Sequence, residues 1–529
     1  MTAKFNIIFI VVVFSFATLT RLLWLPSLPS SLNWDEISHG YNAYSLIETG
    51  ADQWGQQWPI FNFRAYGDYP TTLYMYLSIP FIKLFGLNAL SIRLPSAFLG
   101  IGIVLLLAHF VFLILKTKSS FYLTLLLSLT SPFLIFTSRA VYQSTPALFL
   151  LLLSLYLFYT PKRFVWGLIP LFLSLFAYHN TRLISPLILL VILFFNHRKL
   201  NLRPLLIPLV LFFLGSALVY SQLLFGPASA RSRWVGIITP ASINEINILR
   251  NNSHLPAPLP RLVYNKPVYF ATTFSKNIVS YLNPIPLFIT GSAHYQFNLP
   301  NFGLYYPILL PFFYIGLMFF VLNWRQAVSC QILVLFLVSL IPSALTTGDF
   351  PSLRLTTALP FYFLFIIKGL EMFFSRFPRY TKPIFFIALF VSFGLFIYRY
   401  VYVFPRAYAF AWQDGYSQLV TALKPRYSLY QNIFITKKYG EPHQFILFYW
   451  PISPASYQSD PNLKWDFHAD WYWVNAFDKF VFYNDWEIPT VPQGSLLVTS
   501  SLLPPTSPLQ LIQTITTTNH QPAFYLYEH

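Results

Sequence analysis

Two adjacent carboxylates, Asp35 and Glu36, follow the first apolar run of the chain, in the stretch Leu-Asn-Trp-Asp-Glu-Ile-Ser-His-Gly-Tyr. Acids are scarce beyond the first loop: residues 89–382 hold only Glu245, Asp349 and Glu371. An acid pair beside apolar segments is costly unless water solvates it or the protein uses it. A carboxylate placed there can act as a general base and take a proton from an acceptor hydroxyl. The plain alternative is a pair of acids that water solvates just past a helix end. The rest of the chain must decide between a catalytic pair and a merely solvated one.

Three arginines are expected at the outer ends of different helices, on the membrane face that disfavours basic residues. Arg139 lies in Ser-Arg-Ala-Val-Tyr-Gln, Arg182 follows His-Asn-Thr, and Arg354 follows Asp-Phe-Pro-Ser-Leu. A guanidinium group is a planar, permanently charged fork that suits phosphate oxygens. Snorkelling to lipid headgroups explains one such arginine equally well, but the three together favour a phosphate or pyrophosphate site. The predicted substrate-binding residues are Arg139, Tyr142, His179, Arg182 and Arg354, with Asp68 of the first outer loop as a further carboxylate.

Metal binding is less well supported. His294 and Asp349 are candidate ligands, but no HxH or HExxH spacing is present, so the metal site is unknown and a divalent metal stays open as a cofactor. The single cysteine, Cys330, excludes an intrachain disulfide. No P-loop, GxSxG or GxGxxG motif points to soluble nucleotide chemistry. The aromatic stretch Trp465–Trp486 can stack on sugar rings, although aromatics are also ordinary core residues.

The composition indicates a polytopic membrane protein. Of 529 residues, 56% are hydrophobic and only 10% are charged, which is more apolar surface than a soluble chain of this length needs. The net charge of +17 would suggest nucleic acid in a soluble protein. Here the basic residues fall mainly in short gaps between apolar runs, which indicates membrane topology and no nucleic-acid partner.

We predict about eleven transmembrane helices, since each crossing needs about 20 residues. The candidate runs are 5–25, 89–115, 120–137, 144–160, 164–179, 182–196, 204–225, 304–322, 328–345, 354–374 and 383–404. Basic residues occur in alternate gaps, which places the N-terminus in the cytoplasm and leaves two large outer loops, 26–88 and 226–303. The aromatic run 71–86 is expected to be an interfacial helix. Eleven crossings put the C-terminus outside the plasma (inner) membrane.

The predicted domain organisation is a transmembrane catalytic domain over residues 1–404 and an extracytoplasmic soluble α/β domain over 405–529. The second segment holds nine of the seventeen acids, and Pro and Gly break it into short segments. We expect a helix over 412–423 and strands over 432–436, 445–449, 480–483, 496–499 and 524–527.

The chain resembles the GT-C membrane glycosyltransferases, and within them the protein mannosyltransferase and aminoarabinose transferase group (glycosyltransferase family 39-like). The resemblance covers roughly residues 5–404. It rests on the Asp-Glu pair after the first span, Phe85-Gly86, Ile92-Arg-Leu-Pro-Ser-Ala97, Ser138-Arg139, Tyr178 with Arg182, and Pro342 with Arg354 and Pro360. The chain departs from the family pattern at two places. Asp68-Tyr-Pro70 stands where the family often has Lys-Pro-Pro, and Gln143 stands where many members have an acid. These two differences bear on whether the site has a second carboxylate and a metal.

The resemblance implies a polyprenyl-phosphate sugar donor, transfer on the outer face of the membrane, Asp35 as catalytic base and Glu36 beside it. We therefore expect a glycosyltransferase, hexosyl or pentosyl and inverting, whose partners are that donor, membrane lipids and a lipid, glycan or protein acceptor. The alternative is a transporter or flippase of a lipid-linked saccharide, for which charges near the bilayer midplane and two similar halves would be typical. A mere anchor for the C-terminal domain would not need eleven spans.

Overall fold

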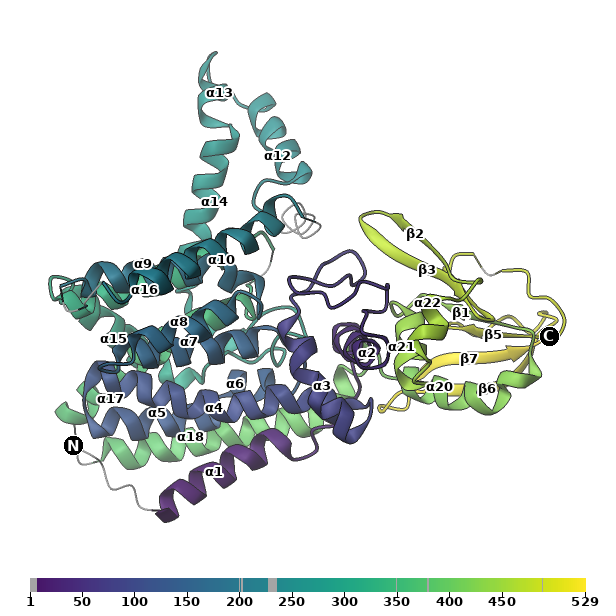
Figure 1. Cartoon of the computed structure of the whole chain (residues 1–529), viewed down its shortest axis with the longest axis horizontal. Helices are drawn as coiled ribbons and strands as arrows, with labels where there is room; N and C mark the ends of the chain where they lie inside the picture. Colours follow the sequence, from purple (N-terminus) through teal and green to yellow (C-terminus); the bar gives the residue numbers. More distant parts are fainter. Residues whose placement is uncertain are drawn as a thin grey trace. The chain divides into compact units, whose positions relative to one another are not determined.

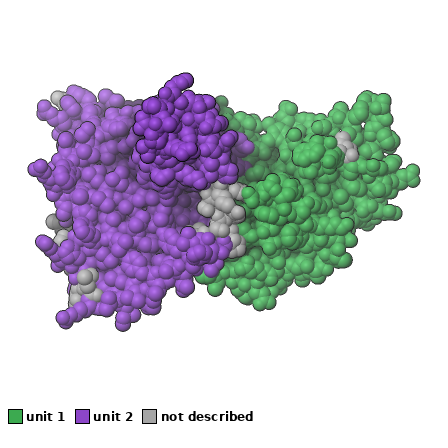
Figure 2. Space-filling model, turned by 90° about the horizontal axis from the view of Figure 1, so that it is seen from above, with its two compact units in different colours: residues 1–98, 137–142, 395–529 green, residues 99–136, 143–394 purple. Residues whose placement is uncertain are grey.

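The computed structural model describes residues 7–198, 200, 203–226, 236–348, 350–377, 380–487 and 489–529, most of them in helices (Figure 1). The chain forms two compact units, which Figure 2 shows in different colours. The first unit contains residues 1–98, 137–142 and 395–529, and the second contains residues 99–136 and 143–394. The predicted domain boundary at residues 404 and 405 lies within the first unit and stays a prediction.

The first unit joins the N-terminal helices to the C-terminal sheet. Its N-terminal part contains α1 (Ile7–Leu22), α2 (Trp34–Thr49) and α3 (Leu73–Phe85), and α4 (Ala89–Leu115) begins there. Its C-terminal part contains η5 (Arg399–Val403), α19 (Phe404–Ala407), η6 (Phe410–Trp412), α20 (Tyr416–Leu423), η7 (Lys424–Leu429), α21 (Pro442–Tyr449) and α22 (Pro454–Gln458). One apolar core spans both parts, because α2 packs against α21 and α22.

The sheet of the first unit has seven strands in the order β2-β3-β4-β1-β5-β7-β6. Its strands are β1 (Asn432–Thr436), β2 (Lys464–His468), β3 (Trp471–Phe477), β4 (Phe480–Tyr483), β5 (Ser495–Thr499), β6 (Gln510–Thr516) and β7 (Pro522–Glu528). The central strand β1 runs parallel to β4 and β5, and the other pairs are antiparallel. Strand β5 is buried along its whole length, as the continuous apolar run of a central strand requires.

The second unit is a helical assembly. Its elements are α5 (Lys118–Thr130), α6 (Pro132–Thr137), α7 (Ser144–Tyr159), α8 (Phe164–Ser174), α9 (His179–Asn196), α10 (Leu206–Leu224), α12 (Pro240–Asn251), α13 (Leu259–Val263), α14 (Lys266–Ser280), η2 (Pro286–Thr290), η3 (Pro307–Leu309), α15 (Leu310–Leu322), α16 (Ala327–Ala344), η4 (Arg354–Ala358), α17 (Leu359–Arg376) and most of α18 (Thr381–Tyr398). Helices α15 and α17 approach at Gly316 and Gly369, where a Cβ atom would lie 1.8 Å from Phe365 O and 2.0 Å from Phe312 O. Small residues of this kind allow close helix packing inside membranes.

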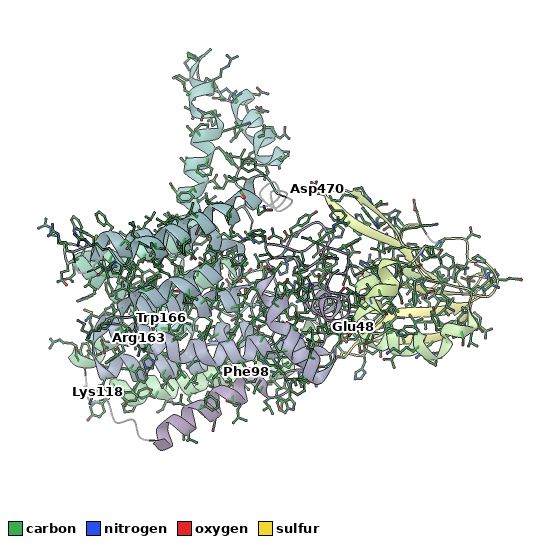
Figure 3. The ribbon with its side chains drawn as sticks, viewed as in Figure 1. Glu48, Phe98, Lys118, Arg163, Trp166 and Asp470 are labelled. Carbon is green, nitrogen blue, oxygen red and sulfur yellow. The ribbon has the colours of Figure 1, made fainter. Side chains whose placement is uncertain are left out.

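Among the described residues, five helices are long and apolar enough to cross a membrane: Ala89–Leu115, His179–Asn196, Ala327–Ala344, Arg354–Arg376 and Thr381–Ala407. Six shorter apolar helices accompany them: Val11–Leu22, Leu73–Phe85, Ser144–Tyr159, Phe164–Ser174, Leu206–Gln222 and Pro307–Leu322. Large apolar side chains on these helices are exposed, for example Phe98 (50%) and Trp166 (63%), which Figure 3 labels. The helices support a multi-pass membrane protein, while the count of eleven spans is not confirmed.

Two local expectations were wrong. The run 120–137 is not one helix, because Ser131 takes extended dihedral angles before Pro132 and separates α5 from α6. A proline disfavours the helical conformation of the residue before it. The segment 445–449, expected as a strand, belongs to α21, which begins at Pro442 and packs on α2 and α20. A short apolar run does not by itself distinguish a buried helix from a strand.

Candidate active site

Asp35 and Glu36 lie in the first turn of α2. Asn33 caps this helix: its side chain accepts a hydrogen bond from the backbone N of Glu36 (2.9 Å), and the Glu36 side chain accepts one from the backbone N of Asn33 (3.2 Å). This reciprocal capping box satisfies two backbone donors that the helix leaves unpaired. Acidic residues are also favoured at a helix N-terminus by its partial positive charge. The local sequence therefore positions both carboxylates.

Glu36 is fully buried and forms a two-pronged ion pair with Arg93. Nε of Arg93 lies 2.9 Å from Oε1 and Nη2 lies 2.9 Å from Oε2. The backbone N of Val141 donates to Oε1 at 3.1 Å, and that of Asn33 donates to Oε2. Each oxygen thus accepts two hydrogen bonds, which hold the carboxylate in a fixed position. The catalytic role predicted for Glu36 stays a prediction.

Arg93 also organises the segment after α1. Its guanidinium donates to the carbonyl oxygens of Leu25 (3.0 Å), Pro29 (3.2 Å) and Ser31 (2.5 Å), and it lies 5.9 Å from the Trp412 ring centroid. Arg93 therefore ties the entry to α2 directly to Glu36. The sequence drew attention to the Ile-Arg-Leu-Pro motif but gave its arginine no role, since the partner lies 57 positions away.

Arg139, a predicted phosphate ligand, is 2% exposed and turns its donors toward the end of α1. Nη1 donates to Thr20 O at 3.0 Å and Nη2 to Leu23 O at 2.7 Å, while the guanidinium lies 5.8 Å from the Tyr400 ring centroid. A cation at helix C-terminal carbonyls is electrostatically favourable. The Arg139 guanidinium therefore hydrogen-bonds to backbone carbonyl oxygens, and its role as a phosphate ligand stays a prediction.

Asp35, in contrast to Glu36, is exposed. Its backbone oxygen accepts a hydrogen bond from Nδ1 of His39 at 2.8 Å. Burial lowers the pKa of His39 to about 4, while the hydrogen bond and the negative charge of Asp68 act in the opposite direction. His39 is therefore neutral at physiological pH. Burial, with the charge of Glu36 next, raises the pKa of the predicted site residue Tyr142 well above its ordinary value.

Asp68 lies in the turn that closes against α2. Its carboxylate accepts a hydrogen bond from Tyr69 N at 2.8 Å, and its backbone exchanges two hydrogen bonds with Ala65 (3.0 and 2.8 Å). Inside this turn, the hydroxyl of Tyr66 donates to the backbone oxygen of Trp34 at 2.8 Å. The turn thus rests on the residue that precedes Asp35, and it brings Asp35, His39 and Asp68 into one region of the first unit.

Arg182, His179 and Arg354 belong to the second unit. His179 begins α9, and Arg182 is fully buried in its first turns, with Nε donating to Leu175 O at 3.0 Å. Asn180 donates to Arg354 O at 3.1 Å, which joins the start of α9 to η4. Nη1 of Arg354 donates to Oγ1 of Thr346 at 2.7 Å. The predicted cations of this unit therefore lie on contacting elements.

A cavity of about 490 Å³ lies beside Arg354 in the second unit. It is bordered by polar and aromatic side chains on α12, α14 and the segment before η4: Glu245, Tyr269, Thr273, Lys276, Asn277, Ser280, Tyr281, Asn283, Pro286, Thr346, Gly348, Phe350 and Pro351. The hydroxyl of Tyr269 donates to Oε2 of Glu245 at 2.8 Å. The volume and the mixture of aromatic and hydrogen-bonding groups fit a small polar headgroup.

The metal candidates do not meet in the described part of the chain. Nδ1 of His294 accepts a 3.4 Å hydrogen bond from Gln296 N, and its ring stacks on Phe297 with centroids 3.9 Å apart. Asp349 lies outside the described residues. Within those residues, no three His, Cys, Asp or Glu side chains gather as metal ligands would.

Sequence reasoning missed Glu441, a second carboxylate in the first unit. It is 1% exposed, accepts a hydrogen bond from Nε1 of Trp471 at 2.5 Å, and lies 3.3 Å from His443. Burial raises the pKa of Tyr66, and the charges of Asp35 and Glu441 add to that shift, so both carboxylates act on one hydroxyl. The Gly-Glu-Pro-His stretch before α21 was the available signal.

Comparison with known proteins gives no match to any protein-family model and none to a curated protein. Among solved structures, the archaeal oligosaccharyltransferase AglB from Archaeoglobus fulgidus, in complex with an inhibitory peptide and a dolichol-phosphate, aligns at 13% identity with a TM-score of 0.47. The alignment covers 85% of this chain and 63% of that one, which is less than two thirds of its length.

ArnT from Cupriavidus metallidurans also aligns, at 12% identity in both of its structures. The apo state has a TM-score of 0.44 and coverages of 85% of this chain and 76% of that one. The form bound to undecaprenyl phosphate has a TM-score of 0.42 and covers 98% of each chain. These proteins are GT-C membrane glycosyltransferases. That is the superfamily which the sequence resembles; identities of 12–13% and TM-scores below 0.5 leave the functional case to the residues of this chain.

Proposed function

We propose that this chain is an integral-membrane glycosyltransferase that moves a sugar from a polyprenyl-phosphate donor to a hydroxyl acceptor. The observation that carries the proposal is that the two neighbouring carboxylates have different environments. Glu36 is buried and fully hydrogen-bonded to Arg93, Val141 and Asn33, whereas the neighbouring Asp35 is exposed on the same helix turn. A buried ion pair that fixes a helix start so that the next carboxylate faces outward suits a general base on a rigid support.

In the proposed step, the acceptor oxygen attacks the anomeric carbon of the donor while the bond from that carbon to the phosphate oxygen breaks. The bonding electrons leave with the phosphate, and Asp35 takes the hydroxyl proton. A single displacement of this kind inverts the anomeric configuration. His39 stays neutral and holds the backbone oxygen of Asp35 through its Nδ1.

Within the second unit, the cavity beside Arg354 is the proposed phosphate-binding site. Lys276 lines this cavity and is exposed, and Arg354 contacts Thr346 on its border, so one cation lies at the cavity and a second lies next to it. Tyr281 and Phe350 add aromatic surface for a sugar ring. A polyprenyl-phosphate sugar is the donor class that the sequence resemblance implies, hexosyl or pentosyl.

The finer topology belongs to the same proposal. Eleven crossings with a cytoplasmic N-terminus would put residues 26–88, 226–303 and 405–529 each on the outer side of the plasma membrane. Residues 1–404 would then be the catalytic membrane domain, and 405–529 its extracytoplasmic partner.

The test is release of polyprenyl phosphate from a panel of polyprenyl-phosphate sugars, with a membrane extract as acceptor source. Asp35→Asn keeps the side-chain shape and removes the base, so we expect a rate loss of roughly 10²–10⁴-fold. Glu48→Gln is the matched control, because Glu48 is an exposed acid on the same helix (Figure 3), about 20 Å away by helix rise. Equal rates for wild type and Asp35→Asn would refute the assignment of Asp35. Movement of lipid-linked sugar across vesicles by both proteins, with no release, would favour a flippase instead.

A further inference from the structure

Strands β2 and β3 form a hairpin whose two faces carry different side chains. The pairing sets Asp466 opposite Trp473 and His468 opposite Trp471, so these four side chains share one face. All of β2 is exposed, and Ala469 and Asp470 close the turn with positive φ angles (Figures 1 and 3). This face, with Tyr66 and Trp34 at its inner end, is called the Trp471–Trp473 face below.

Aromatic rings run along the Trp471–Trp473 face to the start of α2. The rings of Trp473 and Trp471 lie 6.0 Å apart, and Trp471 stacks on Tyr66 at 5.5 Å with planes 8° apart. Trp34 lies 6.4 Å from both Tyr66 and Trp471. Trp34 immediately precedes Asp35, so the row of rings ends beside the proposed base.

Hydrogen-bonding side chains line the same face. Lys437 donates to Oδ1 of Asn475 at 2.5 Å, and Nδ2 of Asn475 donates to Oδ2 of Asp466 at 3.1 Å. Nδ1 of His468 lies 2.8 Å from Asp466, and its ring stacks on Trp473 at 5.6 Å. The side chains of His468 and Asp466 are 63% and 52% exposed. Exposed ion pairs add little to the stability of a fold. Stability alone therefore does not explain why this charged network lies in water next to half-buried tryptophans.

The opposite face of the hairpin is already occupied and holds the hairpin in position. The Arg64 guanidinium lies 4.5 Å from the Tyr472 ring centroid, 4.8 Å from that of Trp54 and 5.6 Å from that of Trp465. The backbone N of Tyr472 donates to Tyr66 O at 3.1 Å. Cation–π contacts of this kind are directional, so the Trp471–Trp473 face is presented in a fixed orientation.

We infer that the Trp471–Trp473 face binds a saccharide acceptor and delivers one of its hydroxyls toward Asp35. A sugar ring offers a C–H face to an aromatic ring and hydroxyl groups at its edge to carboxylate, amide and imidazole groups. Trp471, Trp473 and Tyr66 supply the first kind of surface, and Asp466, Asn475 and His468 supply the second. A lipid tail would contact the rings but would form no hydrogen bonds with the polar side chains beside them. The inference rests on the proposed function for the direction of delivery, while binding itself is tested without turnover.

The experiment measures binding of the full-length protein in detergent to a printed array of linear tri- to hexasaccharides of glucose, mannose, galactose and N-acetylglucosamine. Peptides that contain Ser and Thr are printed beside them. We expect the wild type to bind at least one oligosaccharide class and Trp473→Ala to bind it roughly tenfold more weakly. Trp473→Phe keeps a ring and should restore part of the affinity. Trp486→Ala is the matched control, because Trp486 is 80% exposed in the same unit and lies outside the row of rings.

Binding is measured without a donor, so its dependence on Trp473 requires no transfer, which separates this inference from the proposed function. Saccharide binding that depends on Trp473 would stand even if no donor released polyprenyl phosphate. Binding of peptides only, no binding to any printed saccharide, or equal loss in Trp473→Ala and Trp486→Ala would overturn the inference.

Discussion

Replacement of Arg93 by methionine gives the sharpest test of the structural role of Glu36. The substitution removes both prongs of the ion pair and the hydrogen bonds to the carbonyls of Leu25, Pro29 and Ser31. It leaves the Glu36 carboxylate fully buried with only backbone donors. Loss of one partner of a buried ion pair costs about 3–5 kcal/mol, which for a unit of this size corresponds to a fall in apparent Tm on the order of 10 °C.

The double variant Glu36→Gln with Arg93→Met removes the stranded charge and should recover about half of that loss, since a neutral pair of similar volume has little desolvation cost. Glu36→Gln alone leaves Arg93 its backbone carbonyl partners Leu25, Pro26, Pro29 and Ser31, so we expect a smaller loss, about 2–3 kcal/mol. Arg406→Met is the control, because Arg406 is exposed in the same unit and its guanidinium donates to the backbone oxygen of Tyr402, four positions earlier.

The assay is thermal unfolding of the purified full-length variants in one detergent at one scan rate, because membrane proteins often unfold irreversibly. The expected order of apparent Tm is wild type and Arg406→Met highest, then Glu36→Gln and the double variant, with Arg93→Met lowest. A double variant as unstable as the sum of the two single variants would show that the residues do not interact. Wild-type Tm for Glu36→Gln, together with lost activity, would make Glu36 a reacting group and refute the structural reading.

Three further predictions follow from the same unit. Burial lowers the pKa of His39 from 6.5 to about 4, so on acidification the imidazole is protonated in the unfolded chain before it is in the folded one. The free energy of unfolding therefore falls as the pH drops from about 6.5 to 4, by about 3 kcal/mol at most. Unfolding measured at several pH values should show this fall in the wild type and not in His39→Leu. Asn33→Ala removes the cap of α2 and should cost about 1 kcal/mol, seen as faster amide exchange in the first turn. Gly440 has φ +115°, and a Cβ there would lie 2.6 Å from the Trp34 ring, so Gly440→Ala should lower the Tm and shift the Trp34 fluorescence, whereas an unchanged protein would contradict the packing.

Much of the fold could be read from the sequence because membranes impose simple rules. Long apolar runs, few charges and alternating basic gaps follow from the cost of leaving polar groups in lipid, and the structure has apolar helices at most of the predicted runs. Strands β1 and β4 coincide with the predicted 432–436 and 480–483, and β5 and β7 contain the predicted 496–499 and 524–527. Strands β2, β3 and β6 were missed. Strand β2 (Lys-Trp-Asp-Phe-His) alternates polar and apolar residues but is only five residues long and is exposed throughout, and β3 shows no alternation of polar and apolar residues.

The sequence by itself determined where the two carboxylates lie along the chain and why a helix starts there, because Asn33, Asp35 and Glu36 are within one turn of each other and capping is a local interaction. It could not determine which carboxylate is buried. Neighbours on a helix point about 100° apart, and the choice depends on Arg93 and Val141, which are distant in sequence. The same holds for the row of rings, which joins Trp34 and Tyr66 to Trp471 and Trp473, more than 400 positions further along the chain. Contacts of this kind exist only once the chain has folded, because burial and partner geometry, not residue type, decide whether a charged or aromatic side chain supports the fold or faces a substrate.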